Sequence, residues 1–202
     1  MPSFPSLSES LHGAVARLRT AAERDIPEVL IAHQDDPGLH LALGERRPPS
    51  GAELGRRAER SELDRAAGTR VWLTITQRDD DECCGQLGVE ELDWLQRRCR
   101  LHVWVAPRLR GRGLARDALA LAARWLLRDC GLERVQLLCE PGNGPALAAA
   151  RAAGFTPEGV LRAYERRGRQ RVDLTVMAIV AADLDPGAGR EHAQASTAAD
   201  LP

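Results

Sequence analysis

The sequence predicts a mixed α/β domain in which helices flank one mostly antiparallel sheet that contains a single parallel pair of strands. Three observations lead to this fold class. Apolar and β-branched residues alternate over several short runs, as in strands, and apolar residues recur at helical spacing after residue 113. The stretch 99–140 has the order strand, helix, strand, and a right-handed crossover makes such strands parallel neighbours. The other connections are short, which predicts antiparallel pairing.

In the first half of the chain, β-branched and alternating residues mark three strands, at Val15–Thr20, Val71–Thr76 and Gly85–Leu92. The acidic run between the last two is interpreted as a solvated hairpin tip. Two helices are expected here, one from about Asp25 and one from Ser50 to about Ala67. Asp25 precedes Ile26-Pro27, as a helix cap should.

The second half of the chain continues with three strands, at Cys99–Val105, Arg134–Glu140 and Val172–Val180. In the first of them, Leu101, Val103 and Val105 share one face. His102 and Trp104 point to the other face. A histidine packed under a helix is the expected role of His102, and a general base is the alternative. Two helices lie between these strands and each ends at a glycine: Leu114 to Gly131 and Asn143 to Gly154.

The composition is that of a folded chain. With 202 residues, 44% hydrophobic and 28% charged, the protein can bury a core and is not wholly disordered. All 28 basic residues are Arg and nearly balance 29 acids, which argues against a nucleic-acid partner. Five Cys without metal-ligand spacing predict reduced thiols and no metal site. Without a signal peptide or a membrane-length apolar run, we expect a cytoplasmic protein with no membrane partner.

Both ends of the chain are small, polar and aperiodic, whereas the middle carries the periodic elements. We therefore expect a flexible N-terminal segment over residues 1–13 and a disordered tail over residues 186–202. Residues 14–185 would form one domain, because no internal repeat or linker divides them.

The most informative stretch is the loop 107–115, which joins a strand to a helix. At such a helix start, unpaired backbone amides and the positive end of the helix dipole point the same way. Gly111 and Gly113 let an anion approach the backbone, and arginines surround the turn at positions 108, 110, 112 and 116. This is the pattern of a phosphate cradle. A tight turn with solvated arginines explains the same local residues equally well.

Two other kinds of site fit this region less well. Residues 111–116 nearly match the dinucleotide-binding pattern G-x-G-x-x-G, with Glu140 where a ribose-binding acid would lie. However, Arg116 replaces the third glycine and antiparallel strands precede the loop. Arginines at 97, 98 and 100 add positive charge, but a nucleic-acid surface would also need interleaved aromatic residues.

The loop Arg110-Gly111-Arg112-Gly113-Leu114-Ala115 resembles the acyl-coenzyme A loop, Q/R-x-x-G-x-G/A, of the GNAT N-acyltransferases. Further motifs follow in the order of the RimJ/RimL-like branch: Asp117-Ala118, Asn143 before Gly154-Phe155, the turn EGVLR at Glu158–Arg162, and Gly168 with Asp173. The resemblance covers residues 15–185 and is strongest from Val103 onward. It implies a GNAT-like fold.

The resemblance also implies where acetyl-CoA, the cosubstrate, would bind. The backbone at Val103 and Val105 would pair with the pantetheine arm, and Asn143 would contact the cosubstrate near the opening between the two parallel strands. The pyrophosphate would be held by the amides of the loop residues Arg110, Gly111, Arg112, Gly113, Leu114 and Ala115. The reaction would be direct attack of a primary amine on the thioester.

The sequence departs from the family pattern at four positions where relatives often carry functional residues. Cys99 stands where many relatives have a glutamate base, and Arg100 stands where this branch is often acidic. Ala146 replaces a serine that can act as an acid, and Ala150 replaces a frequent tyrosine. These replacements leave the general acid and base open.

Two other residues are candidates for catalysis. Tyr164 is the only tyrosine, and its hydroxyl could protonate the departing thiolate; packing at a sheet edge is the alternative. Glu140 ends a strand and could relay a proton through water; a surface ion pair is the alternative.

We therefore expect an N-acetyltransferase that moves an acetyl group from acetyl-CoA to a primary amine. The acceptor would be a protein N-terminal α-amino group or a small-molecule amine, and association into a homodimer is left open. The vacant acid and base positions keep a second class in play, an acyl-CoA-binding regulatory protein with little or no turnover.

Overall fold

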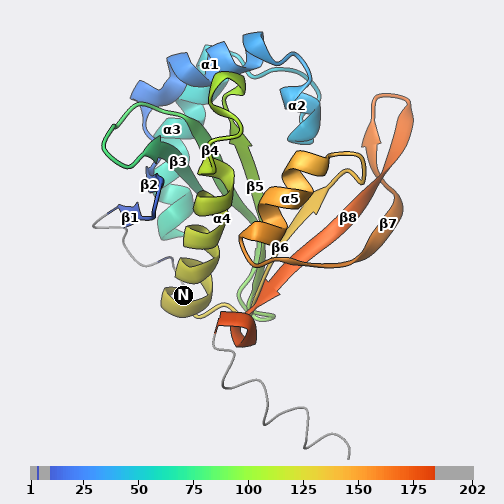
Figure 1. Ribbon diagram of the computed structural model, residues 1–202. Coiled ribbons are helices and arrows are strands. Elements are labelled where there is room, and N and C mark those ends of the chain that lie inside the picture. The colour runs from blue at the N-terminus through green and yellow to red at the C-terminus, as the bar shows by residue number, and fades with distance from the viewer. Residues whose placement is uncertain (1–3, 5–9, 185–202) are drawn as a thin grey trace, which may run out of the picture.

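The computed structural model describes Phe4 and residues 10–184, and these residues form an eight-stranded sheet in the order β1-β2-β3-β4-β5-β6-β8-β7 (Figure 1). The strands are β1 Leu11–His12, β2 Ala16–Thr20, β3 Val71–Gln77, β4 Gly85–Asp93, β5 Arg98–Val105, β6 Arg134–Cys139, β7 Thr156–Arg167 and β8 Gln170–Val180. Neighbouring strands pair antiparallel except β5 and β6, which are parallel. The predicted fold class is confirmed.

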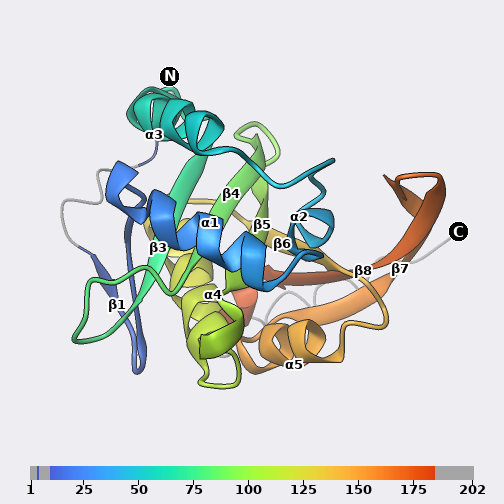
Figure 2. The same cartoon turned by 90° about the horizontal axis from the view of Figure 1, so that it is seen from above.

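Helices cover both faces of the sheet. They are α1 Ile26–Asp35, α2 Leu39–Ala42, α3 Gly51–Ala66, α4 Leu114–Arg124 and α5 Gly144–Ala152, with a π-helical turn at Trp125–Asp129. Seen from above in Figure 2, α4 and α5 lie on one side of the sheet, α3 lies on the other, and α1 crosses near the ends of the central strands. Ser50 caps α3 with the predicted geometry, because its hydroxyl accepts from the Glu53 amide.

Two apolar clusters hold these layers together. The larger lies between the sheet and helices α4 and α5, and it contains Leu101 and Val105 of β5. The smaller lies beneath α1, α2 and α3 and contains Trp104 of β5 and Val29 of α1. The alternation predicted for β5 is therefore confirmed, and this strand presents different residues to the two layers.

The strand β7 was not expected. The motif EGVLR at Glu158–Arg162 was predicted to be a turn, but it lies within β7 and pairs with β8. Two register shifts interrupt this pairing, and Ala163 adopts a φ of 49° within the second of them. Because most of the strand is exposed on both faces, its sequence carries no apolar alternation by which it could be recognised.

The predicted tail 186–202 and most of the predicted flexible segment 1–13 lie outside the described residues. Within residues 1–13, Leu11–His12 forms β1 and pairs with β2. Phe4 is buried, and its ring lies 5.4 Å from that of Trp94 and 5.7 Å from that of Trp125, measured between centroids.

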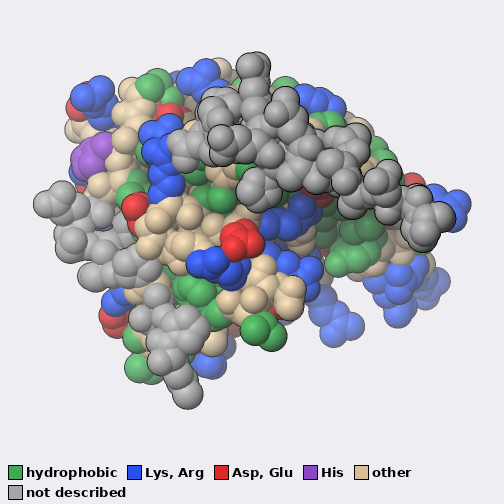
Figure 3. Space-filling view, turned by 90° about the horizontal axis from the view of Figure 1, so that it is seen from below, with side chains coloured by type: hydrophobic (Ala, Val, Ile, Leu, Met, Phe, Trp, Pro, Cys, Tyr) green, Lys and Arg blue, Asp and Glu red, His purple; other side chains and the backbone are tan. Residues whose placement is uncertain are grey.

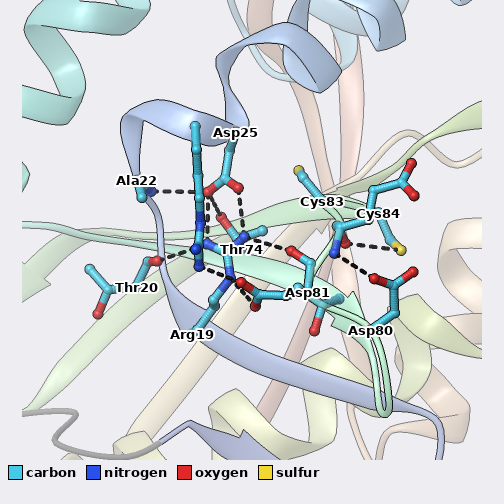
Figure 4. A network of polar contacts seen from close by, with 12 residues as sticks. Arg19, Thr20, Ala22, Asp25, Thr74, Asp80, Asp81, Cys83 and Cys84 are labelled. Atoms are coloured by element: carbon cyan, nitrogen blue, oxygen red, sulfur yellow. Dashed lines mark hydrogen bonds and ion pairs between the residues drawn. The ribbon is translucent and has the colours of Figure 1, made fainter.

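Asp25 precedes α1 as predicted, but its carboxylate makes no cap bond to that helix. It instead accepts hydrogen bonds from the Arg19 guanidinium at 2.6 and 2.9 Å, from the Thr74 hydroxyl at 2.6 Å and from the Ala22 amide at 2.9 Å (Figure 4). Burial alone would raise the pKa of Asp25, but the bonds from Arg19 and Thr74 outweigh it and lower the pKa. Asp25 thus ties β2, β3 and the start of α1 together.

In residues 4 and 10–184, no helix is long and apolar enough to cross a membrane. In the same part of the chain, no three His, Cys, Asp or Glu side chains are grouped so that they could hold a metal ion.

Candidate functional site

The parallel strands β5 and β6 separate along their length. They pair over four residues, from Arg98 opposite Arg134 to Leu101 opposite Leu137. Beyond this point β5 continues to Val105 and β6 to Cys139, with no pairing between them. Val103 and Val105, predicted to meet the pantetheine arm, lie in this unpaired part of β5. We call this unpaired stretch, β5 beyond Leu101 and β6 beyond Leu137, the opening; its unpaired backbone could bind an extended ligand.

The loop from β5 to α4 presents free backbone amides. A 3-10 turn at Pro107–Leu109 is followed by Gly111 at φ 78° and by Gly113 at φ 80°, which precedes the first residue of α4. Both φ values lie in the left-handed region, which glycine adopts without steric cost. Within the described chain, the amides from Gly111 to Arg116 donate to no protein acceptor. The amide of Arg110 differs, because it donates to the Pro107 carbonyl at 3.3 Å.

The four arginines of the loop fall into two groups. Arg108 pairs with Glu28 and Glu82, and Arg110 pairs with Asp36 at 2.6 Å while its Nε donates to the Val105 carbonyl. The other two, Arg112 and Arg116, are exposed and make no ion pair with a described residue. Arg108 and Arg110 thus fasten the loop to α1 and β5, whereas Arg112 and Arg116 are left to meet an external anion.

The rest of the predicted binding segment supports the loop. Leu114 is buried in the larger cluster and Ala115 packs against it, so their side chains hold α4 on the sheet, while their amides donate to no described acceptor. Asp117 accepts hydrogen bonds from the amides of Val15 and Ala16, both at 2.8 Å. This acidic residue of the motif therefore fixes the first turn of α4 to β2.

Asn143 lies at the start of α5, just beyond the end of β6. Its Oδ1 accepts a hydrogen bond from the Ala146 amide at 3.1 Å, so the side chain caps the helix. The cap occupies the side-chain oxygen, whereas the side-chain nitrogen, Nδ2, makes no hydrogen bond within the described residues. That nitrogen can donate to a ligand at the mouth of the opening.

Tyr164 lies on β7 and is half-exposed. It lines a surface hollow of about 500 Å³ together with Leu161 of the same strand, Leu138 of β6 and Val176 of β8. Leu138 is the first residue of β6 beyond the part paired with β5. The hollow also contains Arg134 and Gln136 of the paired part, so it runs along β6 and reaches the opening at Leu138.

Glu140 follows β6 directly and forms an ion pair through Oε1 with Arg167 of β7. Arg167 also pairs with Glu165 at 3.1 Å. The surface ion pair that the sequence left as an alternative for Glu140 is thus present. This contact joins the end of β6 to the β7–β8 hairpin on the far side of the opening.

The four positions that depart from the family pattern are structural. Cys99 is buried beneath α4, and burial raises the pKa of its thiol to about 12, so it is a core residue as expected. Arg100 pairs with Glu91 at 2.7 Å. Ala150 is fully buried in the core, and Ala146 donates its amide to the α5 cap.

A second cavity, missed in the sequence, lies on the other side of β5 from Cys99. It measures about 220 Å³ and is lined by Leu43, Glu45, Arg57, Arg70, Trp72, Glu90 and His102. The lining comes from the α2–α3 connection, α3, β3, β4 and β5, which are far apart in sequence. His102, for which packing under a helix is the expected role, therefore borders a cavity.

The unpaired ends of β5 and β6 and the glycine loop at the start of α4 are features suited to a ligand that joins an anionic group to an extended arm. The sequence model of the family described as "Acetyltransferase (GNAT) domain" matches residues 16–156, well over half of the chain. The chain belongs to this family of GNAT acetyltransferases.

Individual relatives agree with this assignment. The chain is 26% identical over 141 residues to the "Putative ribosomal N-acetyltransferase YdaF" of Bacillus subtilis (strain 168), covering 70% of this chain and 75% of that protein. Its fold is similar to RimJ of Mycobacterium smegmatis in complex with CoA-disulfide, with a TM-score of 0.75, 22% identity, and 93% and 95% of the two chains covered. RimL, a ribosomal L7/L12 α-N-protein acetyltransferase in complex with coenzyme A, gives a TM-score of 0.73 at 18% identity, covering 85% and 98%.

The residues present fit acetyl-CoA. A Cβ atom built on Gly111 would meet no atom within 4 Å, so there is open space beside this glycine of the loop. The unpaired Arg112 and Arg116 add positive charge beside these amides, as a pyrophosphate requires. The protein is thus an acetyl-CoA-dependent acetyltransferase whose acceptor is an amine.

Proposed function

We propose that the acceptor is the α-amino group at the N-terminus of a protein. The observation that carries this proposal is the 500 Å³ hollow between the opening and β7, which is wide and lined by the partly exposed side chains of Leu161 and Tyr164. The strand β7 is also the edge of the described sheet, so its outer backbone can pair with an extended peptide. A small amine would need neither feature.

One face of the molecule agrees with a peptide acceptor more than with a polyanion. In Figure 3, which shows this face from below, Arg side chains lie among acidic, apolar and other groups where the described residues are visible. The name of one similar structure, RimL, describes that protein as an α-N-protein acetyltransferase. A cytoplasmic location would follow from such an acceptor, and both this location and the homodimer stay predictions.

In the proposed reaction, the amides from Gly111 to Ala115 and the guanidinium of Arg112 hold the pyrophosphate, while Arg110 braces the loop. The backbone at Val103 and Val105 aligns the arm in the opening, and Asn143 donates to it. Bound acetyl-CoA supplies a thioester carbonyl that an amine can attack directly. No covalent enzyme intermediate is required, which agrees with burial of Cys99 away from the opening.

Two residues are proposed for proton transfer near the opening. Tyr164 would donate a proton to the leaving thiolate from its place in the hollow. Glu140 would pass a proton to water through Oε2, which accepts no hydrogen bond from a described residue while Oε1 binds Arg167. Of the two, Tyr164 is the better placed donor, because its hydroxyl makes no hydrogen bond with a described residue, whereas Glu140 is paired with Arg167.

The acceptor class is tested with an amine panel. Purified protein is incubated with acetyl-CoA and peptides that begin with Ser, Ala or Met, with the same peptides blocked at the N-terminus, and with spermidine. Thiol release and product mass are measured. We expect acetylation of free N-termini only. Turnover restricted to spermidine would contradict the proposal, and tight coenzyme A binding without any transfer would establish the regulatory alternative.

Replacing Tyr164 with phenylalanine tests its role as the acid. We expect kcat to fall about 100-fold, the lower range for loss of a general acid, with the Kd for coenzyme A unchanged. Leu161→Ala on the same strand is the matched control, and it should raise KM for the peptide while kcat is kept. If Tyr164→Phe retains the kcat of the unchanged enzyme, Tyr164 serves only packing.

A further inference from the structure

A cavity of about 220 Å³ lies on the α3 side of β5. Of the residues that line it, His102 is the one that belongs to the opening. The last pair between β5 and β6 is Leu101 with Leu137, so His102 is the first residue of β5 beyond the paired part. It points away from the core that contains Leu101, toward the layer of α1 and α3. An amine that enters this cavity therefore meets His102 at the edge of the site where the thioester would lie.

One ring nitrogen of His102 faces a carboxylate. Its Nε2 lies 3.2 Å from Oε2 of Glu90 on the neighbouring strand β4, and both side chains are about one-fifth exposed, at 19% each. Nε2 is shielded from solvent and has no hydrogen-bond partner among the described residues, so its contact with Glu90 is a close electrostatic one. No hydrogen bond of Nδ1 with a described residue is formed either. A carboxylate beside Nε2 favours this orientation of the ring and leaves Nδ1 available to accept a proton.

The charges around the imidazole are otherwise compensated. Glu90 also lies 3.2 Å from Arg70, and the His102 imidazole lowers the pKa of the Glu90 carboxyl. Arg100 on the same strand pairs with Glu91. Across the cavity, the Arg57 guanidinium donates to Glu45 at 2.7 Å. Of these carboxylates, Glu90 is the one that lies against His102.

We propose that His102, oriented by Glu90, is the base that accepts the proton of the acceptor ammonium in acetyl transfer. The inference rests on the proposed function and adds a catalytic residue to it. The ammonium gives one proton to His102, and the neutral amine then forms a C–N bond to the thioester carbon as the C–S bond breaks. The second proton that the nitrogen loses balances the one gained by the leaving thiolate, and His102 returns its proton to solvent.

Other groups near the opening are less suited to this task. The Cys99 thiol faces the opposite layer and stays protonated near neutral pH, because burial raises its pKa to about 12. The Glu140 carboxylate binds Arg167 of β7 through Oε1, and its free Oε2 suits the relay to water proposed above rather than contact with the amine. His102 combines a free nitrogen, a cavity that admits an amine and a place beside the opening.

Steady-state rates of the full-length protein with a peptide that the unchanged enzyme acetylates test the proposal. We expect His102→Gln to lower kcat/KM about 100-fold and to remove the acid limb of its pH profile, since a neutral amide cannot accept the proton. The Kd for coenzyme A should be unchanged, which shows that the variant is folded. His12→Gln, on the exposed strand β1, is the matched control and should behave as the unchanged enzyme.

Two further measurements separate catalysis from packing. Added imidazole should restore part of the rate of His102→Ala, because the cavity can admit it. Glu90→Gln should lower kcat while the Kd for coenzyme A is unchanged, because the ring loses the carboxylate that orients it. If His102→Gln keeps the rate and the acid limb while the unchanged enzyme turns over, the proposal is overturned. If the unchanged enzyme acetylates no amine, the proposed function fails first.

Discussion

Replacing Gly113 with valine is expected to abolish useful binding of coenzyme A. The backbone at this position has a φ of 80°, a conformation that a β-branched residue resists by roughly 1–2 kcal/mol. The loop would relax toward negative φ and turn the neighbouring amides away from the pyrophosphate. Each lost bond to a charged group is worth about 1.5–3 kcal/mol, so two of them weaken binding by at least about 100-fold.

Calorimetry with coenzyme A measures this effect. Gly55→Val is the matched control, because Gly55 lies on α3, where a Cβ atom would meet nothing within 4 Å and φ is not positive. A Cβ on Gly113 would lie 3.7 Å from Val15, an ordinary contact, so Gly113→Val has room to fold. Binding by this variant within threefold of the unchanged protein would contradict the role of the loop.

Replacing Asp25 with alanine is expected to cause the largest loss of stability. Asp25 is 2% exposed and satisfies the buried Arg19 guanidinium, the Thr74 hydroxyl and the Ala22 amide (Figure 4). Its removal leaves a buried positive charge without its main partner, which costs about 3–5 kcal/mol. Urea unfolding at pH 7 measures the change in the free energy of unfolding. Asp79→Ala, at an exposed site in the β3–β4 hairpin, should change it by less than about 0.5 kcal/mol.

The same pair predicts how the stability depends on pH. The pKa of Asp25 is lowered in the folded protein from its usual value of 3.8, so its contribution is fully present above that value. The contribution is lost as pH falls through the lowered pKa of the folded state. The difference in unfolding free energy between the unchanged protein and Asp25→Ala should therefore shrink in acid. A difference that stays constant from pH 7 to pH 2 would show that the carboxylate charge is not what stabilises the fold.

Much of the fold could be predicted because most strands have one buried face. The alternation over residues 71–76, 85–92 and 99–105 located β3, β4 and β5 to within one residue at each end. The strand β7 has no buried face, so its sequence lacks the apolar alternation of a strand, and the motif within it predicts a turn instead. Asp25 was placed correctly before α1, but its bond to Arg19 depends on how β2 and α1 meet, which local pattern does not determine.

The candidate site divides in the same way. The glycines at 111 and 113 mark the loop through local backbone requirements, so its position could be predicted from sequence. The sequence does not predict which of the loop arginines lack an ion pair. Arg108 and Arg110 pair with carboxylates on α1, just after it and in the β3–β4 hairpin, and these contacts depend on the tertiary fold. The cavity at His102 is assembled from five separate segments and leaves no contiguous pattern.

A crystal structure of the protein with coenzyme A is the most direct test of how this enzyme holds its cosubstrate. We predict that pyrophosphate oxygens lie within hydrogen-bond distance of the amides of Gly111 to Ala115. We also predict that the pantetheine arm lies between β5 beyond Leu101 and β6 beyond Leu137. A ligand bound elsewhere, or strands β5 and β6 closed against each other with side chains filling the gap, would contradict it.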